Sequence, residues 1–167
     1  RDTASVLTIH NLGYQGVYPK EHFPFFRLDW EEFFGSGFEF HDAINLLKAG
    51  ITTANCLSTV SPTYSREIQT PSQGFSLDGL LRHRSRDLVG ILNGIDTEVW
   101  NPETDEYLPA HYSVDDLSGK AVCKLVLQET FGLPSDPTVP LFGIVTRLTD
   151  QKGIAEMFGP GYGALPQ

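Results

Sequence analysis

The sequence has few of the residues that mark several large classes of protein. It holds two cysteines among 167 residues, too few for a disulfide framework. No apolar stretch approaches the ~20 residues that a membrane-spanning helix needs. Basic residues are also scarce, since 12 Lys and Arg stand against 21 Asp and Glu, for a formal net charge of −9. This balance argues against nucleic acid or an anionic membrane as the main partner.

The residues that are present indicate a folded protein. The hydrophobic fraction is 40%, which is enough for a packed core and argues against a disordered chain. The length suits one ordinary domain or pieces of two. The sparse cysteines favour a reducing compartment, either the cytosol or a plastid stroma. The first ten residues have no signal-peptide layout and run almost directly into a strand, so we expect a fragment of a longer protein.

Short apolar runs alternate with helical patterns along the chain. Buried strands are predicted over 5–9, 56–61, 88–92 and 140–146, and helices over 42–54, 62–69, 76–87 and 113–133. Asp42 and Ser113 are the expected N-caps of the first and last helices, and Gly132 is the expected stop of the last. The aromatic segment 17–40 predicts a loop with short helical turns. The alternation of strands and helices indicates parallel α/β structure.

Polar motifs follow several of the predicted strands. They are "HNLGYQG" at 10–16, "NGID" at 93–96 and "TRLTDQKG" at 146–153. Parallel α/β sheets bind ligands outside the carboxyl ends of their strands. Motifs at three such ends are expected if their strands line a shared cleft.

The first motif suits a carbohydrate. His10 directly follows a strand, where an imidazole can hydrogen-bond to a polyol or stabilise developing charge. The alternative is a core histidine whose ring is satisfied internally. Asn11, Tyr14 and Gln15 add hydrogen-bonding groups around two glycines that allow close backbone approach.

The other two motifs each have a plainer interpretation beside the functional one. Asn93-Gly94 is a standard tight-turn dipeptide as well as a candidate ligand contact or hinge. Arg147 and Lys152 flank a predicted strand-to-helix turn, where free backbone N–H groups favour an anion. Arg offers a planar fork to phosphate oxygens and Lys a mobile point charge. The spacing is not that of a Walker A loop, and a solvated cationic loop is the alternative.

Several segments together resemble a known family. They are TIHNLGYQGVYP, INLLKAGI, STVSPTYSREI, LVGILNGIDTEVWNPETD and PLFGIVTRLTDQKGI, in this order between residues 8 and 154. In order and spacing they resemble the bacterial glycogen synthase and plant starch synthase family. The resemblance implies an α/β fold with the Rossmann-like parallel sheets of a two-domain GT-B glycosyltransferase, incomplete at both ends. Residues 1–92 would be the later part of the N-terminal domain, 93–97 the hinge and 98–167 the start of the C-terminal domain.

The resemblance also implies an activity. This is the transfer of glucose from ADP-glucose to the non-reducing end of an α-1,4-glucan, glycogen or starch, with retention of configuration. It implies no metal ion and no cofactor, and a place in the bacterial cytoplasm or the plastid stroma. His10 corresponds to the histidine beside the transferred glucose, and Arg147 and Lys152 to the pair that holds the diphosphate. These three would be catalytic, and the substrate contacts would also include Asn11, Tyr14, Gln15 and the hinge residue Asn93.

The sequence also departs from the family pattern. The amino-terminal K-x-G-G-L loop and the carboxyl-terminal acidic motif of the family are not in it. From about residue 155 the tail is atypical, because Pro160 and the glycines around it predict a helix no longer than about Phe158. The strand over 140–146 lacks the rest of its sheet and should be exposed. A non-catalytic remnant that keeps glucan or nucleotide affinity is therefore the alternative function.

Overall fold

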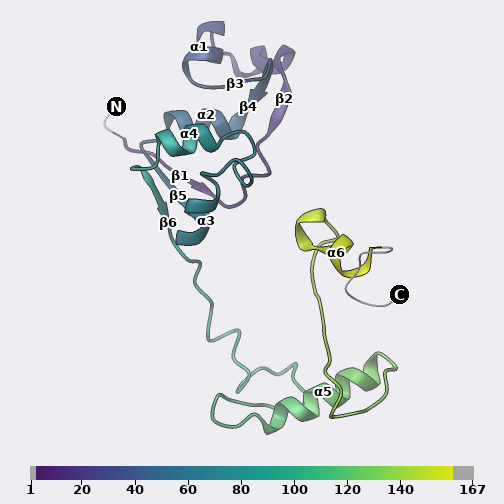
Figure 1. Cartoon of the computed structure of the whole chain (residues 1–167). Coiled ribbons are helices and arrows are strands. Elements are labelled where there is room, and N and C mark those ends of the chain that lie inside the picture. The colour runs from purple at the N-terminus through teal and green to yellow at the C-terminus, as the bar shows by residue number, and fades with distance from the viewer. Residues whose placement is uncertain (1–2, 160–167) are drawn as a thin grey trace. The chain divides into compact units, whose positions relative to one another are not determined.

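The computed structural model describes residues 3–159 (Figure 1). The chain divides into two compact units, Arg1–Ile95 and Asp96–Gln167, here called unit 1 and unit 2. The division falls inside the segment 93–97 that the sequence analysis places as a hinge, and the assignment of the units to two domains stays a prediction. No helix among the described residues is long and apolar enough to span a membrane.

Unit 1 is built on a parallel sheet of three strands in the order β1-β5-β6. The strands are β1 (Val6–Ile9), β5 (Cys56–Thr59) and β6 (Leu88–Gly90). β5 is the central strand and is buried from Leu57 to Thr59, whereas both edge strands are partly exposed. The parallel α/β arrangement is confirmed, as are the strands predicted over 5–9, 56–61 and 88–92.

A second, antiparallel sheet lies beside α1 and α2 in unit 1 (Figure 1). Its strands run in the order β2-β4-β3 and are β2 (Val17–Pro19), β4 (Ala43–Asn45) and β3 (Glu39–Phe40). The helical turns expected in this segment are present as η1 (Lys20–Phe26) and α1 (Trp30–Gly35). The expectation of a loop without strands was wrong, because strands of two or three residues are too short for their alternation to show in the sequence.

Three further helices of unit 1 are α2 (Leu46–Thr53), α3 (Pro62–Glu67) and α4 (Asp78–His83). The prediction that α2 begins behind Asp42 was wrong. The N-cap is Asn45, whose Oδ1 accepts a hydrogen bond from the Lys48 N–H at 2.9 Å. Asp42 is in the left-handed region with a φ of 63° and instead forms an ion pair of 2.6 Å with Lys20.

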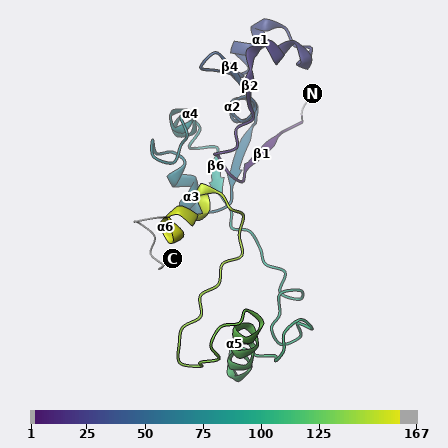
Figure 2. The same cartoon turned by 90° about the vertical axis from the view of Figure 1, so that its right-hand side faces the viewer.

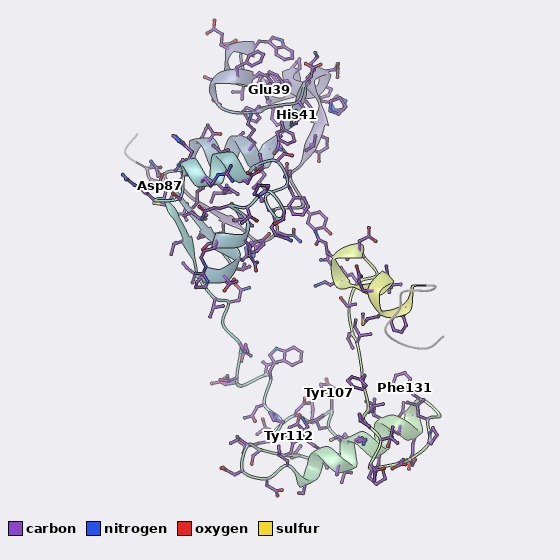
Figure 3. The ribbon with its side chains drawn as sticks, in the orientation of Figure 1. Glu39, His41, Asp87, Tyr107, Tyr112 and Phe131 are labelled. Atoms are coloured by element: carbon purple, nitrogen blue, oxygen red, sulfur yellow. The ribbon has the colours of Figure 1, made fainter. Side chains whose placement is uncertain are left out.

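The predicted helix over 76–87 stops earlier than expected. α4 ends at His83, and the basic residues after it form a turn. Arg84 uses this turn to reach the end of α2, where its guanidinium donates to the carbonyls of Ile51 at 2.6 Å and Ala54 at 2.8 Å. Arg84 also pairs with Asp87 at 2.7 Å, a residue labelled in Figure 3. These carbonyls have no partner within the helix, so Arg84 acts as a cap that joins α2 to the loop before β6.

The hydrophobic core of unit 1 lies where the sheet meets its helices. It combines side chains from β1, β5, α2 and α4 with residues of the connecting loops, namely Ile9, Leu12, Ile51, Ala54, Leu57, Ile68, Leu77 and Leu81. A smaller core of Phe23, Phe33 and Ile44 lies under η1 and α1. There the rings of Phe23 and Phe33 meet edge to face, with centroids 5.2 Å apart.

β6 lies close against the start of α3, and this approach depends on a glycine (Figure 2). A Cβ atom at Gly90 would overlap the backbone carbonyl of Ser61. The side chain of Ser61 caps α3 by accepting from the Tyr64 N–H at 2.8 Å, and Pro62 takes the first helical position as predicted. Because Gly90 has no side chain, the backbone of β6 can lie directly against the backbone at the start of α3.

Among residues 96–159, unit 2 contains one long helix, α5 (Ser118–Thr130), and two short ones, η2 (Asp150–Lys152) and α6 (Ile154–Phe158). α5 begins later than predicted, and Ser113 instead closes a turn by accepting from the Asp115 and Asp116 N–H groups. The predicted stop is confirmed, because Gly132 has a φ of 65° and follows the C-cap residue Phe131, labelled in Figure 3.

The strand predicted over 140–146 is not formed. Phe142 is 84% exposed, and Val145 is fully exposed. A strand is stabilised by ladder hydrogen bonds to neighbours, and no strand lies among residues 96–159 to supply them. The predicted exposure is thus confirmed although the strand was wrong. α6 ends at Phe158, as expected, and the rest of the predicted atypical tail, with Pro160, lies outside the described residues.

Candidate functional site at the carboxyl end of the first strand

The carboxyl end of β1 borders a hollow of about 310 Å³. It is lined by backbone and side chains of β1, the following loop and α2, namely Thr8, Ile9, His10, Asn11, Tyr14 and Leu47. Ile9 is buried and fixes the strand end, while His10 is exposed. The alternative of a core histidine is therefore wrong. The structure brings His10, Asn11 and Tyr14 together on one concave surface.

The loop that carries these residues is held by its own hydrogen bonds. Asn11 Oδ1 accepts from the Gly13 N–H at 2.9 Å, which closes a tight turn. The buried Leu12 donates its N–H to the hydroxyl of Tyr64 in α3 at 3.0 Å. Tyr14 is 58% exposed, so its phenol is available to a ligand. The turn thus presents polar groups while its apolar residue faces the core.

Gln15 has a different place from its neighbours. Its Nε2 donates to the carbonyl of Phe75 at 3.0 Å, and its Oε1 accepts from Asn45 Nδ2 at 2.6 Å. It does not line the hollow. Both ends of the amide are therefore occupied within unit 1, and this geometry favours an indirect role over the predicted direct substrate contact.

Asn93 lies in an irregular segment beyond the parallel sheet. The last bond of the ladder joins the Ile91 N–H to the Thr59 carbonyl at 2.7 Å. Residues 91–96 after it have no turn, and Asn93 is exposed. The tight-turn alternative for Asn93-Gly94 is therefore not supported. Asn93 is not among the residues that line the hollow at β1.

The cationic loop of unit 2 has the turn and helix that the sequence predicts, without the strand. Gly153 takes a φ of 69° between η2 and α6. The backbone N–H of Lys152 donates to the Thr149 carbonyl at 2.9 Å. Arg147 and Lys152 are both exposed, and no ion pair within residues 3–159 engages either of them. Both cations are thus available to an external anion.

Two residues that the sequence analysis did not select also shape the site. Leu47 lines the hollow, and Asn45 lies behind the loop. Asn45 carried a signal, since asparagine before the apolar pattern of α2 is a preferred N-cap. Leu47 carried none, because a leucine in a helix is most often simply core. Within residues 3–159, no group of three His, Cys, Asp or Glu side chains is arranged to hold a metal ion.

Comparison with known proteins gives this arrangement its context. Residues 1–83 match the family described as the starch synthase catalytic domain. Over 98% of its length the chain is 55% identical to a glycogen synthase of Treponema denticola. Over 90% of its length it is 58% identical to a glycogen synthase of Myxococcus xanthus. The chain belongs to the glycogen synthase and starch synthase family.

The fold of this family member also matches a solved structure. The catalytic domain of starch synthase IV from Arabidopsis thaliana, bound to ADP and acarbose, superposes with a TM-score of 0.79 at 37% identity over 89% of the chain. This confirms the α/β fold of a starch synthase catalytic domain. The chain spans about a third of its relatives, 33% of the Treponema protein and 31% of the Arabidopsis chain.

Proposed function

We propose that the chain is part of a retaining glucosyltransferase that moves glucose from ADP-glucose to the non-reducing end of an α-1,4-glucan. The observation that carries this proposal is the match to a starch synthase bound to ADP and acarbose, at 37% identity and a TM-score of 0.79. The names of the bacterial relatives support the same activity. The hollow at β1 has His10, Asn11 and Tyr14 among its lining residues, and these can hydrogen-bond a sugar.

In this proposal unit 1 supplies the sugar side of the reaction. The imidazole of His10 stands exposed at the strand end, where it can hydrogen-bond the transferred glucose and stabilise the charge that develops on its ring. Asn11 and Tyr14 lie on the same hollow and offer an amide and a phenol to sugar hydroxyls. Asn93 would contact the donor sugar from the segment after β6.

Unit 2 would supply the leaving-group side. When the bond between glucose and phosphate breaks and the bond to the acceptor oxygen forms, negative charge builds on the departing ADP. Arg147 and Lys152 are the exposed cations of the loop before α6. Fixed positive groups at such a position stabilise the transition state, and the loss of one typically costs about 10²–10³ in rate. The planar guanidinium and the mobile ammonium would share one diphosphate.

The test needs the whole catalytic cleft, so it uses a chimera. The 167 residues replace the matched third of the Treponema denticola glycogen synthase, and glucose transfer from ADP-glucose to glycogen is measured. We expect His10→Ala to lower kcat far more than it weakens ADP binding. Arg147→Ala and Lys152→Ala should each lower kcat/KM by about 10²–10³. The double variant should lose less activity than the two single losses combined would give.

The outcomes separate the activity from the non-catalytic alternative. An inactive chimera, measured beside an active Treponema parent, would contradict the proposed activity. If Arg147→Ala and Lys152→Ala both keep near-parental rates, residues 146–153 would be a solvated loop and not an anion-binding site. Sustained glucan extension by the 167-residue chain alone would exclude the non-catalytic alternative.

A further inference from the structure

A chain of hydrogen bonds runs behind the loop that carries His10. The Lys48 N–H donates to Asn45 Oδ1 at 2.9 Å, and Asn45 Nδ2 donates to Gln15 Oε1 at 2.6 Å. Gln15 Nε2 then donates to the Phe75 carbonyl at 3.0 Å. Asn45 is fully buried, so water cannot replace its bonds if they are lost. We call these linked amides of Asn45 and Gln15 the amide relay.

The amide relay has a fixed direction. An amide side chain can usually rotate to exchange its oxygen and nitrogen, but here each end of the chain is a backbone group with a single role. The Lys48 N–H can only donate, so Asn45 must turn its oxygen toward it. The Phe75 carbonyl can only accept, so Gln15 must turn its nitrogen toward it. Asn45 nitrogen and Gln15 oxygen then meet in the middle, and no reversed arrangement satisfies both ends.

The amide relay ties the loop to α2. The first N–H groups of a helix have no partners within it. Here the Leu46 and Leu47 N–H groups donate to the carbonyls of Gly16 at 3.2 Å and Gln15 at 3.0 Å. The backbone carbonyls of Gln15 and Gly16 thus form part of the N-terminal cap of α2. The amide relay holds Gln15 a second time, through its side chain. Leu47 in turn lines the hollow.

The other end of the amide relay is a strained turn. Phe75 and Ser76 are consecutive non-glycine residues with φ values of 46° and 65°. Such conformations persist only where surrounding contacts hold them. The bond from Gln15 to the Phe75 carbonyl is one of these contacts. Breaking the amide relay therefore removes one contact from this turn as well as from the loop.

We propose that Gln15 and Asn45 are positioning residues, which hold His10 and Tyr14 in place for the transferred sugar without touching it. This inference rests on the proposed function for its kinetic consequence. The loop is fixed at Leu12 by Tyr64 and at Gln15 by the amide relay, and Tyr14 lies between these two anchors. A small displacement of a catalytic group is enough to slow a reaction strongly.

The kinetic test uses the active chimera described above. Gln15→Met keeps the length of the side chain and removes both amide bonds. Asn45→Asp keeps the N-cap, because aspartate accepts from the Lys48 N–H as asparagine does, but it has no donor for Gln15. We expect each to lower kcat by about tenfold or more with less than about a twofold change in the KM for ADP-glucose. The double variant should be no slower than the slower single.

Two further variants distinguish positioning from general stability. Gln69→Met is the matched control. The amide of Gln69, which follows α3, donates to the Ser65 carbonyl of that helix at 2.7 Å and takes no part in the amide relay, so this variant should leave kcat unchanged. Gln15→Glu should be as slow as Gln15→Met, because a carboxylate has no N–H to donate to the Phe75 carbonyl. An active chimera in which Gln15→Met and Asn45→Asp both keep kcat within about twofold would overturn the proposal.

Amide hydrogen exchange on the 167-residue chain provides an independent readout that does not depend on the activity. Gln15→Met should speed exchange at the Leu46 and Leu47 amides by about tenfold or more, while the amides of β5 keep their rates. Unchanged exchange at α2 would overturn the amide relay even if the chimera is active. If the unsubstituted chimera is inactive, the proposed function fails, and this measurement alone decides the relay.

Discussion

The two units show what a parallel α/β sequence pattern achieves with and without a sheet. In unit 1, three strands pair and the helices cover a core whose members include Leu57 and Ile51, both fully buried. In unit 2, the buried residues among positions 96–159 are Gly119 and Gln128. The apolar face of α5 borders an open groove of about 450 Å³, beside the contact of Lys120 with the Tyr112 ring. Apolar residues alone do not make a core, because a helix needs a paired sheet or another helix to pack against.

The largest expected effect is on the core of unit 1. Leu57→Ala removes a fully buried side chain from the central strand and should lower the free energy of unfolding by about 2–5 kcal/mol. Its counterpart Leu148→Ala changes a leucine that is 85% exposed in unit 2 and should cost less than about 0.5 kcal/mol.

Each unit contains one tryptophan, which allows the two to be followed separately. Trp30 packs on Phe23 with ring centroids 5.2 Å apart and reports unit 1. Urea titration by Trp30 fluorescence, with Trp100 replaced by phenylalanine, measures the effect of Leu57→Ala. Amide exchange over residues 96–159 measures that of Leu148→Ala. Equal losses of unfolding free energy in the two units would contradict this prediction.

The next prediction concerns a glycine in each unit. Gly90→Ala would press a methyl group into the Ser61 carbonyl at the edge of the sheet, and overpacking of this kind costs about 1–3 kcal/mol. Gly143→Ala in unit 2 meets no atom within 4 Å and should be nearly neutral. Urea titrations of the two variants test the contrast. A Gly90→Ala protein as stable as the parent would mean that β6 and α3 do not approach closely in solution.

The sequence predicted the three strands of the parallel sheet of unit 1 because their apolar runs are bounded by clear loops, and these strands have partners. It predicted the strand over 140–146 on the same grounds, and this one was wrong. The pattern "LFGIV" specifies residues that favour a pleated, half-buried surface, but pairing is a property of neighbours. A single segment carries no information on whether those neighbours are there.

The candidate site was predicted with the same limits. His10, Asn11 and Tyr14 could be selected because polar residues directly after a strand of a parallel sheet lie at the ligand-binding edge. Gln15 looks the same in sequence, yet its amide is used by Asn45 and Phe75, which lie 30 and 60 positions away. The sequence does not show such distant hydrogen bonds, so it cannot separate a positioning residue from a substrate contact.

A smaller effect is expected from the cap of α2 in unit 1. Arg84→Lys keeps the charge but loses the planar fork that reaches several carbonyls at once, and should cost about 1–2 kcal/mol. The matched change in unit 2 is Arg147→Lys, at an exposed residue without an ion pair among residues 3–159, and it should leave stability unchanged. Trp30 fluorescence in urea measures the first, and amide exchange over 96–159 the second. A neutral Arg84→Lys would show that charge alone caps the helix.

The smallest expected effects are on the pH dependence of stability. The two units should respond at opposite ends of the pH scale. In unit 1 the hydrogen bond to Asp42 raises the pKa of the exposed Lys20 above 10.5. A raised folded pKa means that this contribution is complete below the unfolded value and is lost as the pH rises through the folded one. In unit 2 the pKa of Asp136 is lowered, first by the Thr138 hydroxyl and then by the Thr138 N–H.

The sign for Asp136 is therefore the reverse of that for Lys20. A lowered folded pKa gives a contribution that is present above the ordinary value near 3.8 and is lost as the pH falls through the folded pKa. Thr138→Val removes the hydroxyl that donates to Asp136 Oδ1 at 2.7 Å and should move the carboxyl pKa back toward 3.8. Carboxyl chemical shifts between pH 2 and 6, with Asp136→Asn to assign the signal, measure the change. The titration of Lys20 should not move. An Asp136 pKa that stays low in Thr138→Val would mean that the backbone N–H groups of Thr138 and Val139 and the charge of Lys124 sustain it without the hydroxyl.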